Sequence, residues 1–106
     1  MLKEKIISHA PEAPYFDESQ YKKGGGYMTV HKEVGSFTDF YTVEYFNQMS
    51  LKYDTYETLF EKSDPTTSLL GTSVGELIQR GIPNHKIVIG KPASSKDVQN
   101  TGLVDP

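Results

Sequence analysis

The stretch FYTVEYFN, residues 40–47, decides how the rest of the chain is organised. Aromatic and β-branched residues dominate it and no Gly or Pro interrupts it, a composition typical of a strand. Because strand side chains alternate, Glu44 shares one face with Phe46, and Tyr45 shares the other face with Asn47. An ionised carboxylate is almost never fully buried without a partner. Glu44 therefore faces either a wet cavity or, if the strand lies at a sheet edge, the solvent.

Two further strands flank this one in the sequence. Residues 5–10 (KIISHA) form a short apolar run that Pro11 and Pro14 end, because proline cannot donate to a strand ladder. Residues 85–90 (HKIVIG) carry three consecutive aliphatic residues, which predicts a strand buried on both faces, as in a parallel sheet.

Helical patterns lie between the strands. Tyr56, Leu59 and Phe60 have the i, i+3, i+4 spacing of a helix over residues 54–62. SVGE, residues 73–76, is a capping box that opens a second helix, and Gly81 is the expected stop. Residues 27–34 fit either a short helix or an irregular segment, and periodicity does not choose between them.

The alternation of strands and helices predicts successive βα units in a single α/β domain over residues 1–106. In such units, functional residues gather at the carboxyl ends of parallel strands. The three ends carry residues that are unusual there: prolines with Glu12, Glu44 with a following amide, and Gly90 with Pro92. This coincidence raises the cavity interpretation of Glu44 to equal weight with the edge-strand interpretation, and both stay open.

Composition excludes several function classes. The net charge of −3 shows no basic patch, so we expect no nucleic-acid partner. The absence of Cys excludes disulfides and thiolate metal sites, and His9, His31 and His85 lack the spacing of metal ligands, so we expect no metal and no cofactor. The run GGG at 24–26 does not match a phosphate-binding loop and predicts a flexible turn. No apolar run approaches the ~18 residues of a membrane span, and no signal peptide opens the chain; localisation stays open.

Four segments together resemble a known family. They are APEAPYF (10–16), DFYTVEYFNQ (39–48), GIPNHKIVIGKPA (81–93) and GLVDP (102–106). In order and spacing they are similar to the segments around barrel strands five, six and seven of glycoside hydrolase family 18, in particular the fungal and plant class III-like chitinases. The resemblance covers nearly the whole chain. It implies that the chain is part of a (β/α)8 TIM barrel, about three parallel βα units.

The resemblance also implies a function. Family members hydrolyse β-1,4-linked N-acetylglucosamine polymers by a substrate-assisted retaining mechanism, and are often secreted. The implied partner is chitin or an N-acetylglucosamine oligosaccharide. The implied substrate-binding residues are Glu44, Phe46, Asn47, Tyr45 and Glu12.

Departures from the family bear on catalysis. The 106 residues contain no Asp-x-x-Asp-x-Asp-x-Glu motif, which supplies the family's general acid, and no residue is assigned a catalytic role. A general acid contributes ~10²–10⁴-fold in rate, so we expect the isolated chain to be inactive. Phe46 stands where the family has Tyr, and Glu44 where it has Gln. A three-stranded piece would also leave two strand edges and one face open, which predicts self-association.

Two alternatives stay open. One is a non-catalytic binder of chitin or N-acetylglucosamine, in which Tyr15, Tyr27 and Tyr53 stack on sugar rings. The other is a small α/β interaction domain whose resemblance to the family is architectural only.

Overall fold

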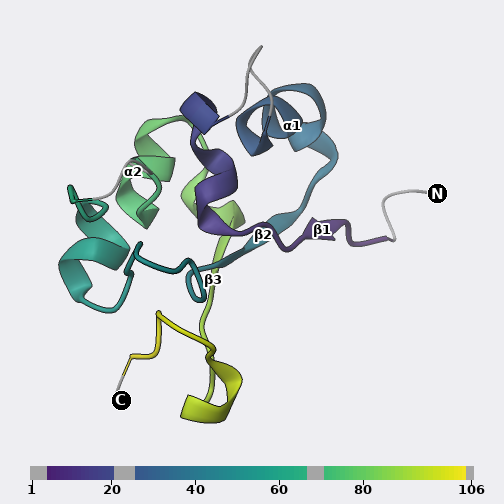
Figure 1. The fold of residues 1–106 in the computed structure, drawn as a ribbon. Coiled ribbons are helices and arrows are strands. Elements are labelled where there is room, and N and C mark those ends of the chain that lie inside the picture. The colour runs from purple at the N-terminus through teal and green to yellow at the C-terminus, as the bar shows by residue number, and fades with distance from the viewer. Residues whose placement is uncertain (1–4, 21–25, 67–70, 105–106) are drawn as a thin grey trace.

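A three-stranded parallel sheet forms the centre of the fold. The computed structural model describes residues 5–20, 26–66 and 71–104. The strands are β1 (Ser8–His9), β2 (Phe40–Glu44) and β3 (Ile87–Gly90), and they lie in the order β1-β2-β3 with β2 in the middle (Figure 1). Both pairings are parallel. The predicted α/β domain with parallel strands is confirmed, and the described residues form an open sheet.

The strands are shorter than the sequence predicts, for local reasons. β1 ends before Pro11, which cannot donate to the ladder, although Glu12 still makes an isolated parallel bridge with Glu44. β2 ends at Glu44, and Asn47 then takes a positive φ of 62° that turns the chain out of the sheet.

Within the described residues, two α-helices and several single turns lie between the strands, and one further turn follows β3. α1 (Tyr27–Val34) settles the open choice for that segment in favour of a helix, and α2 (Val74–Gln79) lies where the capping box predicts it. The helix predicted over 54–62 is a single π-helical turn, η5 (Glu57–Glu61). The remaining turns are 3₁₀-helical: η2 (Ala13–Phe16), η3 (Glu18–Gln20), η4 (Gly35–Phe37), η6 (Asn84–Lys86) and η7 (Ser95–Asp97). Most of the glycine run at 24–26 lies outside the described residues.

One face of the sheet carries the core. Tyr41, Val43 and Tyr45 are fully buried, which confirms the alternation predicted for this strand. They pack with residues from the turns, loops and helices: Ala13, Phe16, Leu51, Tyr53, Leu59, Leu77 and Ile82.

The opposite face of the sheet is not covered by the described elements. Val88 of β3 is 44% exposed, so the prediction that this strand is buried on both faces is wrong. The aliphatic run identified a strand correctly, but the structure packs side chains on one side of it only. None of the described helices has the length and apolar character needed to cross a bilayer.

The α2 capping box also fastens the preceding loop. The Glu76 carboxylate accepts hydrogen bonds from the Ser63 backbone (2.6 Å) and hydroxyl (2.7 Å) and from the Ser73 backbone (3.3 Å) and hydroxyl (2.8 Å). Burial would raise the pKa of Glu76, but these hydrogen bonds outweigh it and hold the pKa below its ordinary value. The charged carboxylate therefore stabilises the fold.

We expect Glu76→Ala to lower the free energy of unfolding by about 1–3 kcal/mol, because it leaves several buried donors without an acceptor. Urea denaturation measures this change, with Glu61→Ala as the control at an exposed glutamate. Since the folded-state pKa is depressed, the stabilisation is present at neutral pH and lost as the pH falls through it. Equal denaturation midpoints for Glu76→Ala and wild type at neutral pH would contradict this role.

Two buried tyrosines determine how the stability of the fold responds to high pH. The Tyr45 and Tyr53 rings meet edge to face at 4.8 Å, and their hydroxyls contact the Thr72 carbonyl (3.0 Å) and the Thr72 hydroxyl (2.6 Å). Burial strongly raises the pKa of both phenols. Because the raised pKa belongs to the folded state, the fold loses stability as the pH rises above the ordinary tyrosine range.

In an ultraviolet titration, Tyr45 and Tyr53 should ionise only together with loss of circular dichroism. Tyr45→Phe and Tyr53→Phe should each reduce the late absorbance step by one phenolate. A single early step with the circular dichroism intact would show that these rings are accessible.

Candidate functional site

The carboxyl ends of β1 and β2 bring the backbones of two acidic residues together. Glu12 and Glu44 are paired across the strands, and the Glu44 amide donates to the Pro11 carbonyl at 2.8 Å. Gly90, at the end of β3, lies opposite Glu44 on the other side. Register partners in a sheet point to the same face, so Glu12 and Glu44 lie on the open face. The structure thus places these two strand ends side by side, and a binding role for the two residues stays a prediction.

An exposed aromatic side chain lies beside Glu12. The Tyr15 hydroxyl donates to Glu12 Oε1 at 3.3 Å, and Tyr15 is 41% exposed. Its ring is nearly parallel to that of Tyr27, at 10° and 6.5 Å between centroids. His9 Nδ1 and the Tyr27 hydroxyl form a hydrogen bond of 3.2 Å, which fixes the second ring. The Tyr15 ring is thereby held next to the Glu12 carboxylate.

Phe46 and Asn47 begin the β2 exit loop, which we define as residues 45–53. The Asn47 side-chain oxygen accepts from the backbone amides of Gln99 (2.8 Å) and Asn100 (3.3 Å), and its own amide donates to the Thr101 carbonyl (2.8 Å). Asn47 therefore ties this loop to the C-terminal segment, residues 98–104, and its side-chain oxygen already has partners. Phe46 is half-buried and lies two residues beyond the end of β2.

The close contact between the two segments needs a glycine. A Cβ at Gly102 would lie 2.5 Å from the Phe46 Cα, and Gly102 has a φ of +99°. Both facts exclude a larger residue without a shift of the backbone.

Tyr45 lies apart from the other predicted residues. Its ring is fully buried under the sheet and its hydroxyl donates to the Thr72 carbonyl, so it packs in the core and does not reach the open face. Tyr53 is buried in the same way, which removes it from the three tyrosines considered for stacking on a sugar. A tyrosine in a strand can either pack in the core or contact a ligand. Only its partners in the folded structure distinguish these two roles.

Lys91 is a site residue that the sequence analysis missed. Its ammonium donates to the carbonyls of Tyr45 (2.8 Å), Gly102 (3.0 Å) and Tyr53. Burial lowers the pKa of Lys91 to about 8, and the nearby Asp54 carboxylate opposes that shift. A lysine placed directly after Gly90 at a strand end was the available signal.

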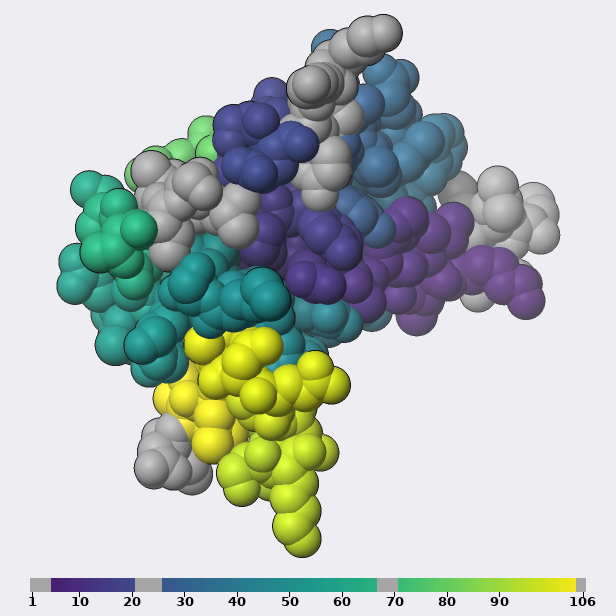
Figure 2. Space-filling view, viewed as in Figure 1, coloured from purple at the N-terminus to yellow at the C-terminus, as the bar shows by residue number. Residues whose placement is uncertain are grey.

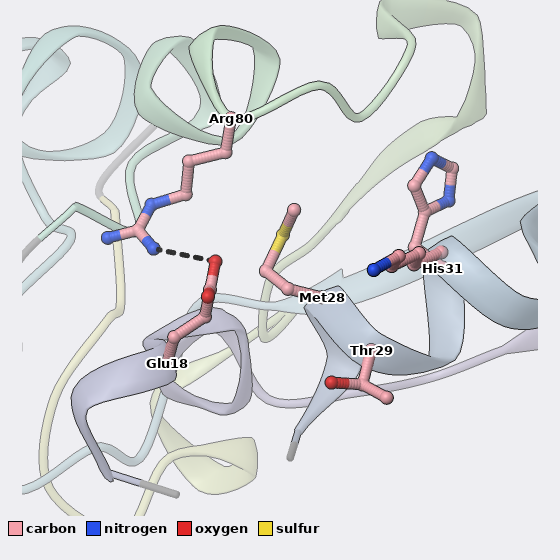
Figure 3. Close-up of a pocket in the computed structure, with 6 residues that line it drawn as sticks. Glu18, Met28, Thr29, His31 and Arg80 are labelled. Atoms are coloured by element: carbon pink, nitrogen blue, oxygen red, sulfur yellow. Dashed lines mark ion pairs between the residues drawn. The ribbon is translucent and has the colours of Figure 1, made fainter. Parts of the chain in front are cut away.

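A separate pocket lies on the helical side of the molecule (Figure 3). Its volume is about 480 Å³, and its walls come from η3, α1 and the end of α2: Glu18, Met28, Thr29, His31, Lys32 and Arg80. Arg80 and Glu18 form an ion pair of 3.9 Å across one wall. None of the sequence-predicted site residues lines this pocket. This pocket and the carboxyl edge of the sheet are therefore different places.

His31 packs against the core and is hydrogen-bonded there. His31 Nδ1 and the Tyr41 hydroxyl are hydrogen-bonded at 2.8 Å. Burial, followed by the positive charge of Lys86, lowers the pKa of His31, which keeps the ring neutral near pH 7. Among the described residues, no group of three or more potential metal ligands converges.

Comparisons of the chain with models of protein families, with curated proteins and with solved structures gave no match.

The role of Asn47 predicts how two substitutions differ. Asn47→Gly removes the two hydrogen bonds from the side-chain oxygen but keeps the freedom to adopt positive φ. Asn47→Ala removes the same bonds and adds an unfavourable left-handed conformation, which costs about 1–2 kcal/mol. We therefore expect both variants to unfold at lower urea concentration than wild type, with Asn47→Ala the less stable. The reverse order would show that the backbone conformation at Asn47 is not a constraint.

Proposed function

We propose that this chain is part of a chitinase-type (β/α)8 barrel of the family 18 kind, and that it binds N-acetylglucosamine polymers along the carboxyl edge of its sheet. The observation that carries the proposal is the in-register pair Glu12 and Glu44 at the ends of β1 and β2. In parallel α/β folds, ligands bind at this edge. The order and direction of the strands agree with three consecutive strands of a barrel.

The chemistry of the edge suits a carbohydrate. Carboxylate oxygens accept hydrogen bonds from sugar hydroxyls and from the N–H of an acetamido group, and such charge-assisted bonds are the stronger ones. The half-exposed Tyr15 ring offers a flat apolar surface for the face of a sugar ring, and its hydroxyl is already oriented by Glu12. Phe46 would add a second apolar contact at the end of β2.

The same residues argue against hydrolysis by this polypeptide alone. Substrate-assisted cleavage needs a general acid, and no Asp-x-x-Asp-x-Asp-x-Glu occurs in the 106 residues. The family tyrosine that would hold the acetamido group is replaced by Phe46, which has no hydroxyl. The proposed activity of the isolated chain is therefore binding.

Titration calorimetry with chitohexaose tests this function. Glu12→Gln and Tyr15→Ala should each weaken binding by about 5–10-fold, which corresponds to one hydrogen bond or ring contact of roughly 1 kcal/mol. Glu44→Gln should weaken binding similarly while leaving thermal stability unchanged or higher, because it removes a half-buried charge. Tyr56→Ala, at a 71% exposed ring on η5's N-cap, is the matched control.

A fluorogenic chitobioside should give no turnover above buffer with the purified chain. Clear turnover would contradict the inactive part of the proposal. Absence of any heat of binding with chitohexaose, or equal weakening by Tyr56→Ala, would contradict the binding part.

The open sheet face favours a second candidate, an interaction domain that associates with itself. Ile6 is 77% exposed and Val88 44% exposed, and the outer edges of β1 and β3 have no strand partner within the described residues. An uncovered apolar face of this kind is typical of an interface. Analytical ultracentrifugation separates this candidate from the first: a dimer that dissociates on Val88→Lys supports it, and a monomer at all concentrations excludes it.

A further inference from the structure

Lys91 lies at the junction of three segments that are distant in sequence. It follows directly after the end of β3, and its ammonium contacts the two ends of the β2 exit loop and the C-terminal segment. Figure 2 shows the C-terminal part of the chain projecting from the body beside residues of the exit loop. Segments of this kind have few apolar contacts to hold them, so a polar contact at their junction carries much of the attachment.

The number of donors matches the number of acceptors. An ammonium has three N–H donors and no acceptor, and three main-chain carbonyls converge on Lys91: those of Tyr45, Tyr53 and Gly102. A neutral amine has two donors and would leave one of these carbonyls without its partner. The full junction therefore requires the protonated side chain.

A second set of hydrogen bonds joins the same two segments, the β2 exit loop and the C-terminal segment. The Gln99 and Asn100 amides donate to the Asn47 side chain, the Asn47 amide donates to Thr101, and the Met49 amide donates to Asn100 Oδ1 at 3.1 Å. All of these bonds cross between the β2 exit loop and the C-terminal segment. They also hold Asn47 and Met49 at positive φ, of 62° and 55°, which non-glycine residues adopt only where surroundings impose it.

We propose that Lys91 is a positioning residue: its ammonium fastens the C-terminal segment to the β2 exit loop and thereby sets the place of Phe46, two residues beyond Glu44. This inference rests on the proposed function for its ligand, while the junction itself rests on the contacts alone. Lys91 does not touch the ligand in this arrangement. Its effect on binding passes through Phe46, whose main chain follows the Tyr45 carbonyl directly.

The pH dependence follows from the surroundings of the amine. Burial favours its neutral form and Asp54 favours its charged form, with burial the larger effect. The segments packed around it otherwise present main-chain carbonyls, from Tyr45, Tyr53 and Gly102. The junction should thus lose one hydrogen bond as the pH rises through about 8.

Heteronuclear NMR tests the junction without a ligand. The amide nitrogens of Phe46, Asp54 and Leu103 follow the three accepting carbonyls, so their shifts report the hydrogen bonds that those carbonyls accept. In wild type they should titrate together with a midpoint near pH 8. Lys91→Met should abolish this common titration and expose the Asn47, Gln99 and Asn100 amides to hydrogen exchange. Lys86→Met, which removes a lysine contact to the Gly35 carbonyl elsewhere, should leave all these signals unchanged.

Calorimetry with chitohexaose then tests the positioning role. Lys91→Met should weaken binding by about tenfold if the competent population falls to about a tenth, and wild-type affinity should decline above pH 8 while that of the variant stays flat. If the three amides do not titrate together in wild type, the proposal is overturned, even if Lys91→Met fails to fold. Unchanged affinity in Lys91→Met overturns the positioning role. Amides that titrate in a protein that binds no chitohexaose support the junction and overturn only the proposed ligand.

Discussion

The parallel register of β2 with both of its neighbours is the constraint on which the rest of the molecule depends. It turns Tyr41, Val43 and Tyr45 into the core and leaves Glu44 on the opposite face. Because the strands run the same way, their carboxyl ends meet at one edge, where Glu44 finds Glu12 and Gly90 as neighbours. A shift of one residue would exchange the two faces of β2 and place a carboxylate in the core. Stability and the candidate site therefore share one set of hydrogen bonds.

Local signals in the sequence predicted the parts of the fold that local physics decides. The alternation in β2 and the capping box at Ser73 and Glu76 each involve neighbours a few residues apart, and both were correct. The segment 27–34 was ambiguous because all its residues remain partly exposed, so no clear apolar stripe marks a helix. The double-sided burial expected for Val88 was wrong because hydrophobicity identifies a strand but does not say which elements cover it.

The candidate site was predictable only in part, because several of its contacts join residues that are distant in the sequence. Glu12 and Glu44 follow from a topological rule about strand ends, which needs no knowledge of side-chain contacts. The roles of Tyr45 and Asn47 depend on partners far along the chain, Thr72 and residues 99–101, and their residue types fit several functions. Lys91 was missed because its three acceptors are main-chain carbonyls, and any residue can supply a carbonyl.

The place of β2 between two strands from opposite ends of the chain has a consequence for synthesis. β1 and β2 can pair early, but the other edge of β2 stays unpaired until β3 has left the ribosome. Contacts between segments that are distant in sequence also form slowly. During that interval the edge of β2 that pairs with β3 lacks its hydrogen-bond partner. A nascent chain in this state offers an apolar strand edge to other chains. Chaperone contact should accordingly concentrate on growing polypeptides that end before Ile87.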